Sequence, residues 1–379
     1  MSAIIKREFP VALLRQPIES RLTYFRAKTV DHFKLRISRD NTLHYIQAAP
    51  QGSTILICGP TGVGKTTLAE SMLSILYDLG TAKMHENPGH IPVLMINAIA
   101  PDSGMFNWKD FYKRALIEAK EPLIDQKRKS LKRRNAHESL KEYNLNNNSS
   151  NPSLRLAYES CLLNRAPIAL IIDEGQHMAI MPSGRRLRDN MEVIKSLASN
   201  TLVQHVLVGT YDLLTLANLS GQLARRNRII HFPRYRFEIK EDMEEFMRII
   251  LTFQKHLPLY DEPNLIDQYE YLYEKSLGCV GILKTHLLFA LAEALKQGKN
   301  KMSREILERN AISSTSLRQI AQEIVEREKM LEDNHDSDIR TMLGISEIEN
   351  EASTVNPSPN RVKRRVGERK PYRDPVGRN

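Results

Sequence analysis

The chain has 379 residues, of which 41% are hydrophobic, and it carries a formal net charge of +10. This composition excludes a wholly disordered or fibrous protein and leaves room for a large core, a smaller domain and a tail. The three cysteines, Cys58, Cys161 and Cys279, lie far apart without ligand spacing, so we expect buried thiols in a reducing compartment. No apolar run approaches the length of a membrane span, and the N-terminus lacks a signal-peptide core. We therefore expect a cytoplasmic protein without a membrane partner.

The first 237 residues are predicted to contain a leader and an α/β domain. Residues 1–50 form the leader, with one helix at 30–48, and the α/β domain follows at 51–237. Apolar strand-like segments then alternate with helical patterns, which predicts a parallel sheet covered on both faces. The strands are expected at 54–58, 91–97, 168–173, 204–209 and 229–232, and the helices at 65–79, 108–120, 153–164 and 187–199.

The remaining segments differ in composition from this domain. Residues 121–151 hold a basic cluster and an Asn-rich run, which predict a flexible insertion. Residues 238–331 have no strand pattern and form an all-α lid domain, and 332–379 have too few apolar residues to fold, so we expect a disordered tail. Lid helices are expected at 240–255, 264–276, 280–297, 302–308 and 314–331.

The most specific motif lies between the first strand and the next helix. It has the spacing of a nucleotide-phosphate loop, in which glycines let backbone N–H groups face a phosphate at a helix N-terminus. Lys65 reaches the β- and γ-phosphates, and the Thr66 hydroxyl is a ligand for Mg²⁺. The pattern predicts that the chain binds ATP with Mg²⁺. The predicted cofactor-binding residues are Gly59, Pro60, Thr61, Gly62, Val63, Gly64, Lys65, Thr66, Thr67 and Asp173.

A second acidic motif ends the strand at 168–173. Asp173 is predicted to hold Mg²⁺ together with Thr66, and Glu174 to orient or deprotonate the attacking water. Thr210 ends the next strand, where its side chain would reach the same water or the γ-phosphate. The second acid, Glu174, favours hydrolysis over phosphoryl transfer to another substrate.

Three arginines precede the last strand. Arginines in such a run usually form a solvated face, but in an ATPase they also suit an arginine finger that acts on a neighbouring subunit's nucleotide. Arg226 is the favoured candidate, and Arg225 and Arg228 remain open. A finger in trans would make a homo-oligomer a condition of activity.

With these motifs in this order, the chain resembles AAA+ ATPases, and more specifically the TniB/TnsC-type regulators of DNA transposition. The resemblance covers about 50–330. It makes Lys65 and Thr66 Walker A, Asp173 and Glu174 Walker B, and Thr210 the sensor-1 position. Lys284 stands where lids of this class often carry a sensor-2 arginine, and its role stays open. The shared pattern falls on 170–177, 190–197, 208–210, 222–226 and 232–235.

The resemblance implies a function and partners. Such regulators assemble as rings or helical filaments on duplex DNA, link a target-selection protein to the transposase, and are dismantled by ATP hydrolysis. A replication initiator or helicase loader of the same superfamily is one alternative. A nucleotide-gated DNA scaffold with little hydrolysis is another, and a secretion-type AAA+ ATPase is a weaker third.

Basic residues outside the nucleotide motif are the candidate DNA contacts, and they suit a phosphate backbone rather than a base sequence. Trp108, Phe111 and Ala115 share one helical stripe, which we expect to pack in the core. The basic tail, with eight basic residues and two acids between Arg361 and Arg378, is either a docking segment or a solubilising tail. The candidate DNA-binding residues are Lys109, Lys113, Arg114, Arg185, Arg186 and Arg188.

Overall fold

The computed structural model describes residues 7–101, 104–121, 150–179, 184–217, 227–332 and 343. The chain forms two units, Met1–Ile324 and Val325–Asn379, and the first contains the sheet and most of the lid. Most of the expected insertion at 121–151 and nearly all of the tail expected at 332–379 lie outside the described residues.

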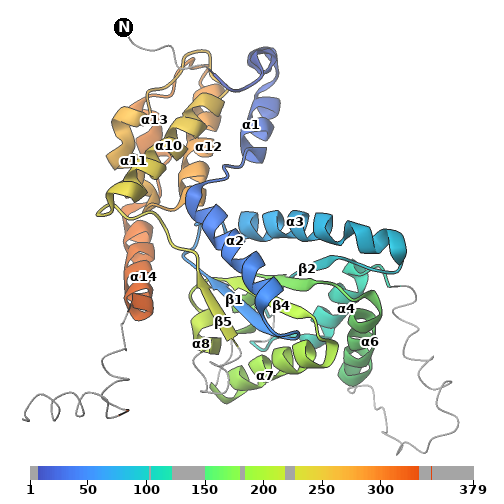
Figure 1. Cartoon of the computed structure of the whole chain (residues 1–379). Helices are drawn as coiled ribbons and strands as arrows, with labels where there is room; N and C mark the ends of the chain where they lie inside the picture. The colour runs from blue at the N-terminus through green and yellow to red at the C-terminus, as the bar shows by residue number, and fades with distance from the viewer. Residues whose placement is uncertain are drawn as a thin grey trace, which may run out of the picture. The chain divides into compact units, whose positions relative to one another are not determined.

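The first unit is built around a five-stranded parallel sheet in the order β2-β3-β4-β1-β5 (Figure 1). Its central strands are fully buried apolar runs, as expected for a parallel sheet covered on both faces. All five predicted strands are present, with ends within two residues of those expected. The strands are β1 (Thr54–Cys58), β2 (Val93–Asn97), β3 (Ala169–Asp173), β4 (Gln204–Gly209) and β5 (Asn227–His231).

Helices cover both faces of this sheet. On one face, α2 and α3 pack on a cluster that includes Ile55, Ile171 and Val206, while α7 and α8 contact β1 on the other (Figure 1). Helix α3 runs past the end predicted at 79. Gly80 lies within it, and the absence of a Cβ there lets the ring of Pro92 pack closely against the helix. The helices are α2 (Phe33–Ala48), α3 (Lys65–Glu86), α4 (Trp108–Glu118), α6 (Ser150–Arg165), α7 (Gly184–Thr201) and α8 (Leu213–Ala217).

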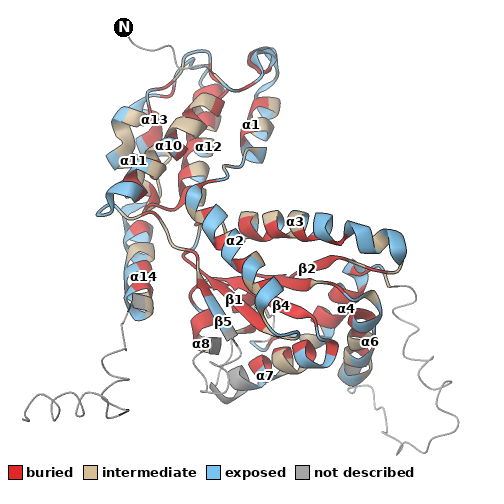
Figure 2. Ribbon diagram, viewed as in Figure 1, coloured by how far each residue is buried: buried red, intermediate tan, exposed pale blue. Residues whose placement is uncertain are grey.

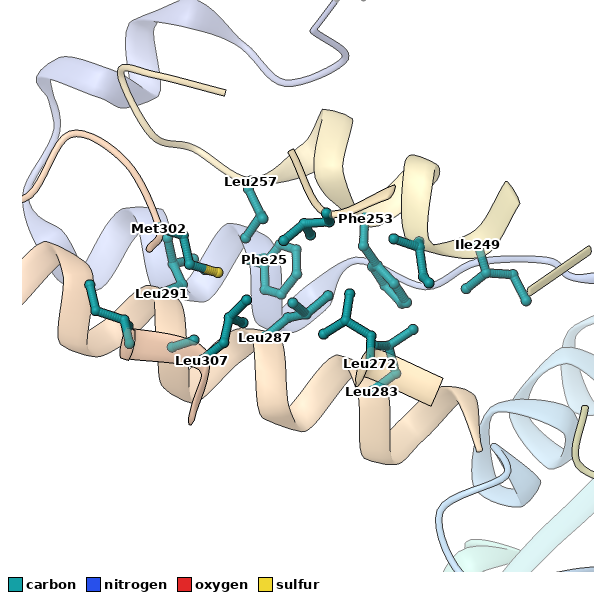
Figure 3. Packing of buried hydrophobic residues seen from close by; sticks show 14 of the residues in the cluster. Phe25, Ile249, Phe253, Leu257, Leu272, Leu283, Leu287, Leu291, Met302 and Leu307 are labelled. Atoms are coloured by element: carbon teal, nitrogen blue, oxygen red, sulfur yellow. The ribbon is translucent and has the colours of Figure 1, made fainter. Parts of the chain in front are cut away.

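The lid is a helical layer with its own core. The segment predicted as one helix at 264–276 is a 3₁₀ turn, η4 (Ile266–Gln268), followed by α11 (Tyr269–Ser276). Figure 2 shows the buried stripe of α10 and α12, and Figure 3 shows its side chains at close range. The other lid helices are α10 (Lys240–His256), α12 (Val280–Lys296), α13 (Arg304–Arg309) and α14 (Ser314–Glu332).

The expected N-terminal leader contains more structure than its one predicted helix. A 3₁₀ turn, η1 (Val11–Arg15), and helix α1 (Ile18–Ala27) precede α2. Helix α1 packs on the lid helix α12, whereas α2 packs on α3, β1 and β5. The N-terminal segment thus contributes one helix to the lid and the next to the sheet domain.

Within the described residues, no single helix is both long and apolar enough to cross a membrane. The bent pair Ile266–Ser276 and Val280–Lys296 passes that test by length and composition, with a bend of 113°. Most apolar residues of α12 are buried in the lid core.

Two buried histidines are expected to make the fold sensitive to acid. Loss of hydration on burial lowers the pKa of His32 and of His205 to about 4. Because these folded-state pKa values lie below the unfolded value of about 6.5, the unfolded chain binds more protons between pH 6.5 and 4. Stability is therefore fully present above pH 6.5 and falls on acidification, by on the order of 2 kcal/mol per histidine at pH 5.

Thermal unfolding between pH 8 and pH 5 tests this prediction. His32→Asn should flatten the dependence of the melting temperature on pH, and His44→Asn, at an exposed position of α2, should not. If the melting temperatures of wild type and His32→Asn depended on pH in the same way, the lowered pKa of His32 would not be the cause of the acid sensitivity.

Candidate nucleotide site

The phosphate loop joins β1 to α3. Gly62 and Gly64 have φ values of 76° and 113°, a left-handed conformation that glycine adopts without a Cβ penalty. Gly64 is the N-cap of α3, so Lys65 is the first residue of the helix. The free N–H groups of the loop and the positive end of the helix dipole therefore face the same space, which suits a phosphate.

The Lys65 side chain folds back over this loop. Its Nζ donates to the carbonyl oxygens of Pro60 at 2.8 Å and Gly59 at 3.1 Å. Burial lowers the pKa of Lys65, and the nearby Glu174 carboxylate offsets part of that effect. The ammonium group thus lies between the loop and the acidic end of β3.

Asp173 and Thr66 meet beside the loop. Burial raises the pKa of Asp173, and hydrogen bonds from the Glu174 N–H and the Thr66 hydroxyl act in the opposite direction. The Glu174 N–H donates to Asp173 Oδ1 at 2.8 Å. A carboxylate and a hydroxyl in contact are hard oxygen donors, and together with phosphate oxygens they fit Mg²⁺.

The described residues contain no group of three or more His, Cys, Asp or Glu side chains that could hold a metal ion without a substrate. A metal at Asp173 and Thr66 would therefore depend on the phosphates for further ligands, as Mg²⁺ in nucleotide sites usually does.

Glu174 lies where the chain leaves β3. Its backbone is left-handed, with φ at 54°, and its side chain is 47% exposed, so the carboxylate is open to solvent. Gln176 Nε2 donates a hydrogen bond to Glu174 Oε2. His177 Nε2 lies 4.0 Å from the same oxygen, too far for a hydrogen bond.

Thr210 lies at the end of β4 and is tied to this group. Its backbone N–H donates to Gln176 Oε1 at 3.2 Å, and its hydroxyl donates to Asp212 Oδ2 at 3.3 Å. The fold therefore brings Lys65, Thr66, Asp173, Glu174 and Thr210 together at the carboxyl edge of the sheet. Gln176 belongs to the same group, although no role was predicted for it.

The arginine-finger candidates are described only in part. Arg225 and Arg226 lie outside the described residues. Arg228 lies in β5, where its Cα pairs with that of Ile55. Its guanidinium carbon is 4.4 Å from the centre of the Tyr45 ring, and Nη2 donates to the Tyr45 hydroxyl.

The lid touches the phosphate loop through backbone. The Gly281 N–H, at the start of α12, donates to the Gly62 carbonyl at 2.7 Å, and a Cβ on Gly281 would lie 2.6 Å from that oxygen. Lys284, one turn further, donates from Nζ to the Arg26 carbonyl at 2.7 Å. The Lys284 ammonium thus contacts the end of α1.

The DNA candidates on α4 are at the surface. Lys109 is exposed and Lys113 is partly so, while Arg114 Nε pairs with Asp110 Oδ2 at 2.6 Å. Exposed ion pairs contribute little free energy, so Arg114 can leave Asp110 to bind another negatively charged group. Phe111 and Ala115 are buried, which confirms the predicted core stripe.

Trp108 of the same stripe is partly buried, and its Nε1 donates to Asn190 Oδ1 at 2.9 Å. Helix α7 contains Arg185, Arg186 and Arg188, whose side chains lie outside the description.

Comparison with known proteins gives one domain match. Residues 50–216 match the family model described as an AAA domain. This range begins before the phosphate loop and ends in α8, and it is less than half of the chain. No curated protein matches the sequence.

Several solved structures resemble the chain at low identity. The Aeropyrum pernix ORC2 protein (ADPNP-ADP complexes) is 14% identical, over 78% of this chain and 73% of that one, with a TM-score of 0.48. Drosophila ORC bound to DNA is 11% identical, over 77% and 64%, with a TM-score of 0.47. The Thermotoga maritima RuvB Holliday junction branch migration motor is 14% identical, over 76% and 72%, with a TM-score of 0.42.

The domain match, the sheet order and the loop geometry agree. They confirm the predicted fold class, an AAA+ P-loop NTPase core with a parallel sheet, followed by a helical segment. The match to an AAA domain supports the predicted activity, which is the hydrolysis of ATP.

Proposed function

We propose that this protein is an ATP-dependent, DNA-binding AAA+ regulator of DNA transposition that assembles on duplex DNA and is disassembled by hydrolysis. One observation carries the proposal. Three of the segments shared with TniB/TnsC-type regulators, at 170–177, 208–210 and 232–235, are far apart in sequence but lie at the edge of the sheet that carries the phosphate loop. Asp173 to Gln176 and Thr210 lie at the carboxyl edge of the sheet, and Phe232 to Tyr235 lie where the sheet leads into the lid.

The site residues then have separate tasks in hydrolysis. The loop N–H groups and Lys65 bind the β- and γ-phosphates and stabilise charge on the γ-phosphoryl group as it is transferred. Thr66 and Asp173 hold Mg²⁺, which supplies further charge neutralisation when it is bound. Glu174 orients the attacking water and accepts its proton at the carboxylate.

A neighbouring subunit would complete this site. The Glu174 side chain is 47% exposed, so the acidic edge of the sheet is open to another chain. In our proposal an arginine from the run Arg225 to Arg228, with Arg226 favoured, reaches the nucleotide of the next subunit. An arginine finger stabilises transferred-phosphoryl charge, so ATP turnover would require a homo-oligomer.

DNA is the proposed template for the oligomer. The candidate contacts are Lys109, Lys113 and Arg114 on α4 and the arginines at the start of α7, all of them generic phosphate partners. A target-selection protein and a transposase complete the proposed partners. The resemblance of the sequence motifs to those of TniB/TnsC-type regulators supports the proposal of these two partners.

Electron microscopy of the protein with duplex DNA and a non-hydrolysable ATP analogue tests the proposal. We expect rings or filaments that require both nucleotide and DNA and that form on duplexes of unrelated sequence. Lys65→Ala, which removes the phosphate-binding ammonium, is the control and should not assemble.

Each other outcome has a separate meaning. A protein that stays monomeric under these conditions would refute the regulator proposal. Assembly on only one duplex sequence would favour the replication-initiator alternative. Assembly without phosphate release, even with DNA, would favour the nucleotide-gated scaffold.

A further inference from the structure

The Gln176 side chain bridges the ends of two neighbouring strands. It lies in the 3₁₀ turn η3 (Gly175–Met178) after β3 and is 9% exposed. Its Oε1 accepts from the Thr210 N–H at the end of β4, and its Nε2 donates to Glu174 Oε2. One buried amide thus joins the water-activating carboxylate to the sensor-1 position.

The direction of the Gln176 amide is fixed by its partners. The Thr210 N–H is a donor only, so the amide oxygen must face it. The amide nitrogen then faces the Glu174 carboxylate, which in its ionised form can accept hydrogen bonds but cannot donate them. The opposite orientation would set donor against donor and acceptor against acceptor.

Gly209 leaves the space that the amide occupies. A Cβ at this position would collide with Gln176 Oε1, so the last residue of β4 must lack a side chain for the bridge to form. The turn at Glu174 is equally specific, because its left-handed backbone directs the chain back towards β4. The left-handed backbone at Glu174, the amide of Gln176 and the missing side chain at Gly209 are therefore all needed for the bridge between β3 and β4.

We propose that Gln176 is a positioning residue for hydrolysis, which holds the Glu174 carboxylate in its productive orientation and links that orientation to the β4 end at Thr210. The inference rests on the proposed role of Glu174 as the group that activates water. Glu174 is half exposed, so without this bond its side chain would rotate freely in solvent. Misplacing a catalytic group by about 1 Å costs roughly 100-fold in rate.

Gln176→Met tests the proposal, because methionine has a similar length and no hydrogen-bonding amide. We expect kcat for ATP hydrolysis to fall about 10- to 100-fold, with KM and the affinity for a non-hydrolysable analogue unchanged. His177→Gln is the matched control in the same turn. Its side chain lies beyond hydrogen-bonding distance of Glu174, so its kcat should stay within about twofold of wild type.

A second variant gives a readout that a purely structural role would not produce. Gln176→Glu places a second carboxyl beside Glu174, where like charges repel and one proton is shared. We expect its kcat to be low at pH 8 and to recover towards pH 6, relative to wild type at each pH, because the protonated carboxyl again donates to Glu174.

The outcomes separate this inference from the proposed function. If Glu174→Gln abolishes hydrolysis and Gln176→Met keeps the wild-type kcat, the positioning role is wrong and the role of Glu174 stands. If Glu174→Gln hydrolyses ATP normally, the role of Glu174 fails first. A raised KM with unchanged kcat, or a flat pH profile for Gln176→Glu, also overturns the positioning role.

Discussion

Replacing Glu174 with glutamine is expected to lower kcat for ATP hydrolysis by about 10²- to 10⁴-fold, which is the range for losing a general base. The amide keeps the size of the side chain but cannot accept the proton of the attacking water. Nucleotide binding should persist, because Lys65, Thr66 and Asp173 are unchanged. The variant should therefore remain assembled on DNA for longer than the wild type.

Phosphate release and nucleotide affinity, measured on the same preparation, check this prediction. Glu86→Gln, which removes an exposed carboxylate at the end of α3, is the matched control and should hydrolyse ATP at the wild-type rate. Residual hydrolysis above a tenth of the wild-type rate would assign water activation to another group. Loss of analogue binding would instead place Glu174 in nucleotide binding.

The sheet domain was predictable because its signals are local. Each central strand is a short apolar run that ends at a polar or glycine-rich turn, so β1, β3 and β4 could be located within one residue. Parallel strands bring their carboxyl ends to one edge, and this rule alone predicts that Lys65, Asp173 and Thr210 lie together. The order along the chain was therefore enough to gather the main residues of the site.

The link between Glu174 and Thr210 was not predictable in the same way. Gln176 lies in the shared segment 170–177, but its role depends on a left-handed turn at Glu174, which no local pattern indicates for a glutamate. It also depends on the empty space at Gly209, which lies 33 positions further on. The sequence did contain one signal for this link. An amide residue, Gln176, follows the acid Glu174 by two positions, and the next strand ends in a glycine, Gly209.

Helix α1 was also not predictable, because its burial depends on residues that are far away in the sequence. Residues 18–27 hold Ile18, Leu22 and Phe25 at helical spacing, but the segment is short and its other positions are mostly polar, and no helix was predicted there. Its burial depends on distant partners. Phe25 packs with the lid core, and Arg21 donates from Nε to the Pro258 carbonyl at 2.9 Å.

The N-terminal segment therefore connects lid and sheet domain a second time. The first connection is the chain from β5 to α10, and the second passes from α1 to α2. The two meet at His32, whose Nδ1 is 3.0 Å from the Tyr235 hydroxyl, and at Lys34, which pairs with Asp242. A lid held at two places by the sheet domain is restrained in how it can move over the phosphate loop.

Replacing Phe25 with alanine is expected to destabilise the lid by about 3–5 kcal/mol, the usual cost of removing a buried phenylalanine ring. The Phe25 side chain is fully buried, and its ring lies 5.9 Å from that of Phe253, edge-on (Figure 3). The cavity left behind would lie between α1 and the lid helices α10 and α12. Ile18→Ala, in the same helix but 43% exposed, should change stability by less than about 0.5 kcal/mol.

Hydrogen exchange of the full chain locates the effect. A protein with more than one domain need not unfold in one step, so a single melting temperature would not assign the loss. In Phe25→Ala, amide protection should fall in α10 and α12, while β1 and β4 keep theirs, because Phe25 contacts the lid cluster rather than the sheet cluster. Unchanged protection in α10 and α12 would show that α1 contributes little to the lid. The lid would then be restrained only by the connection from β5 to α10 and its contacts with His32 and Lys34.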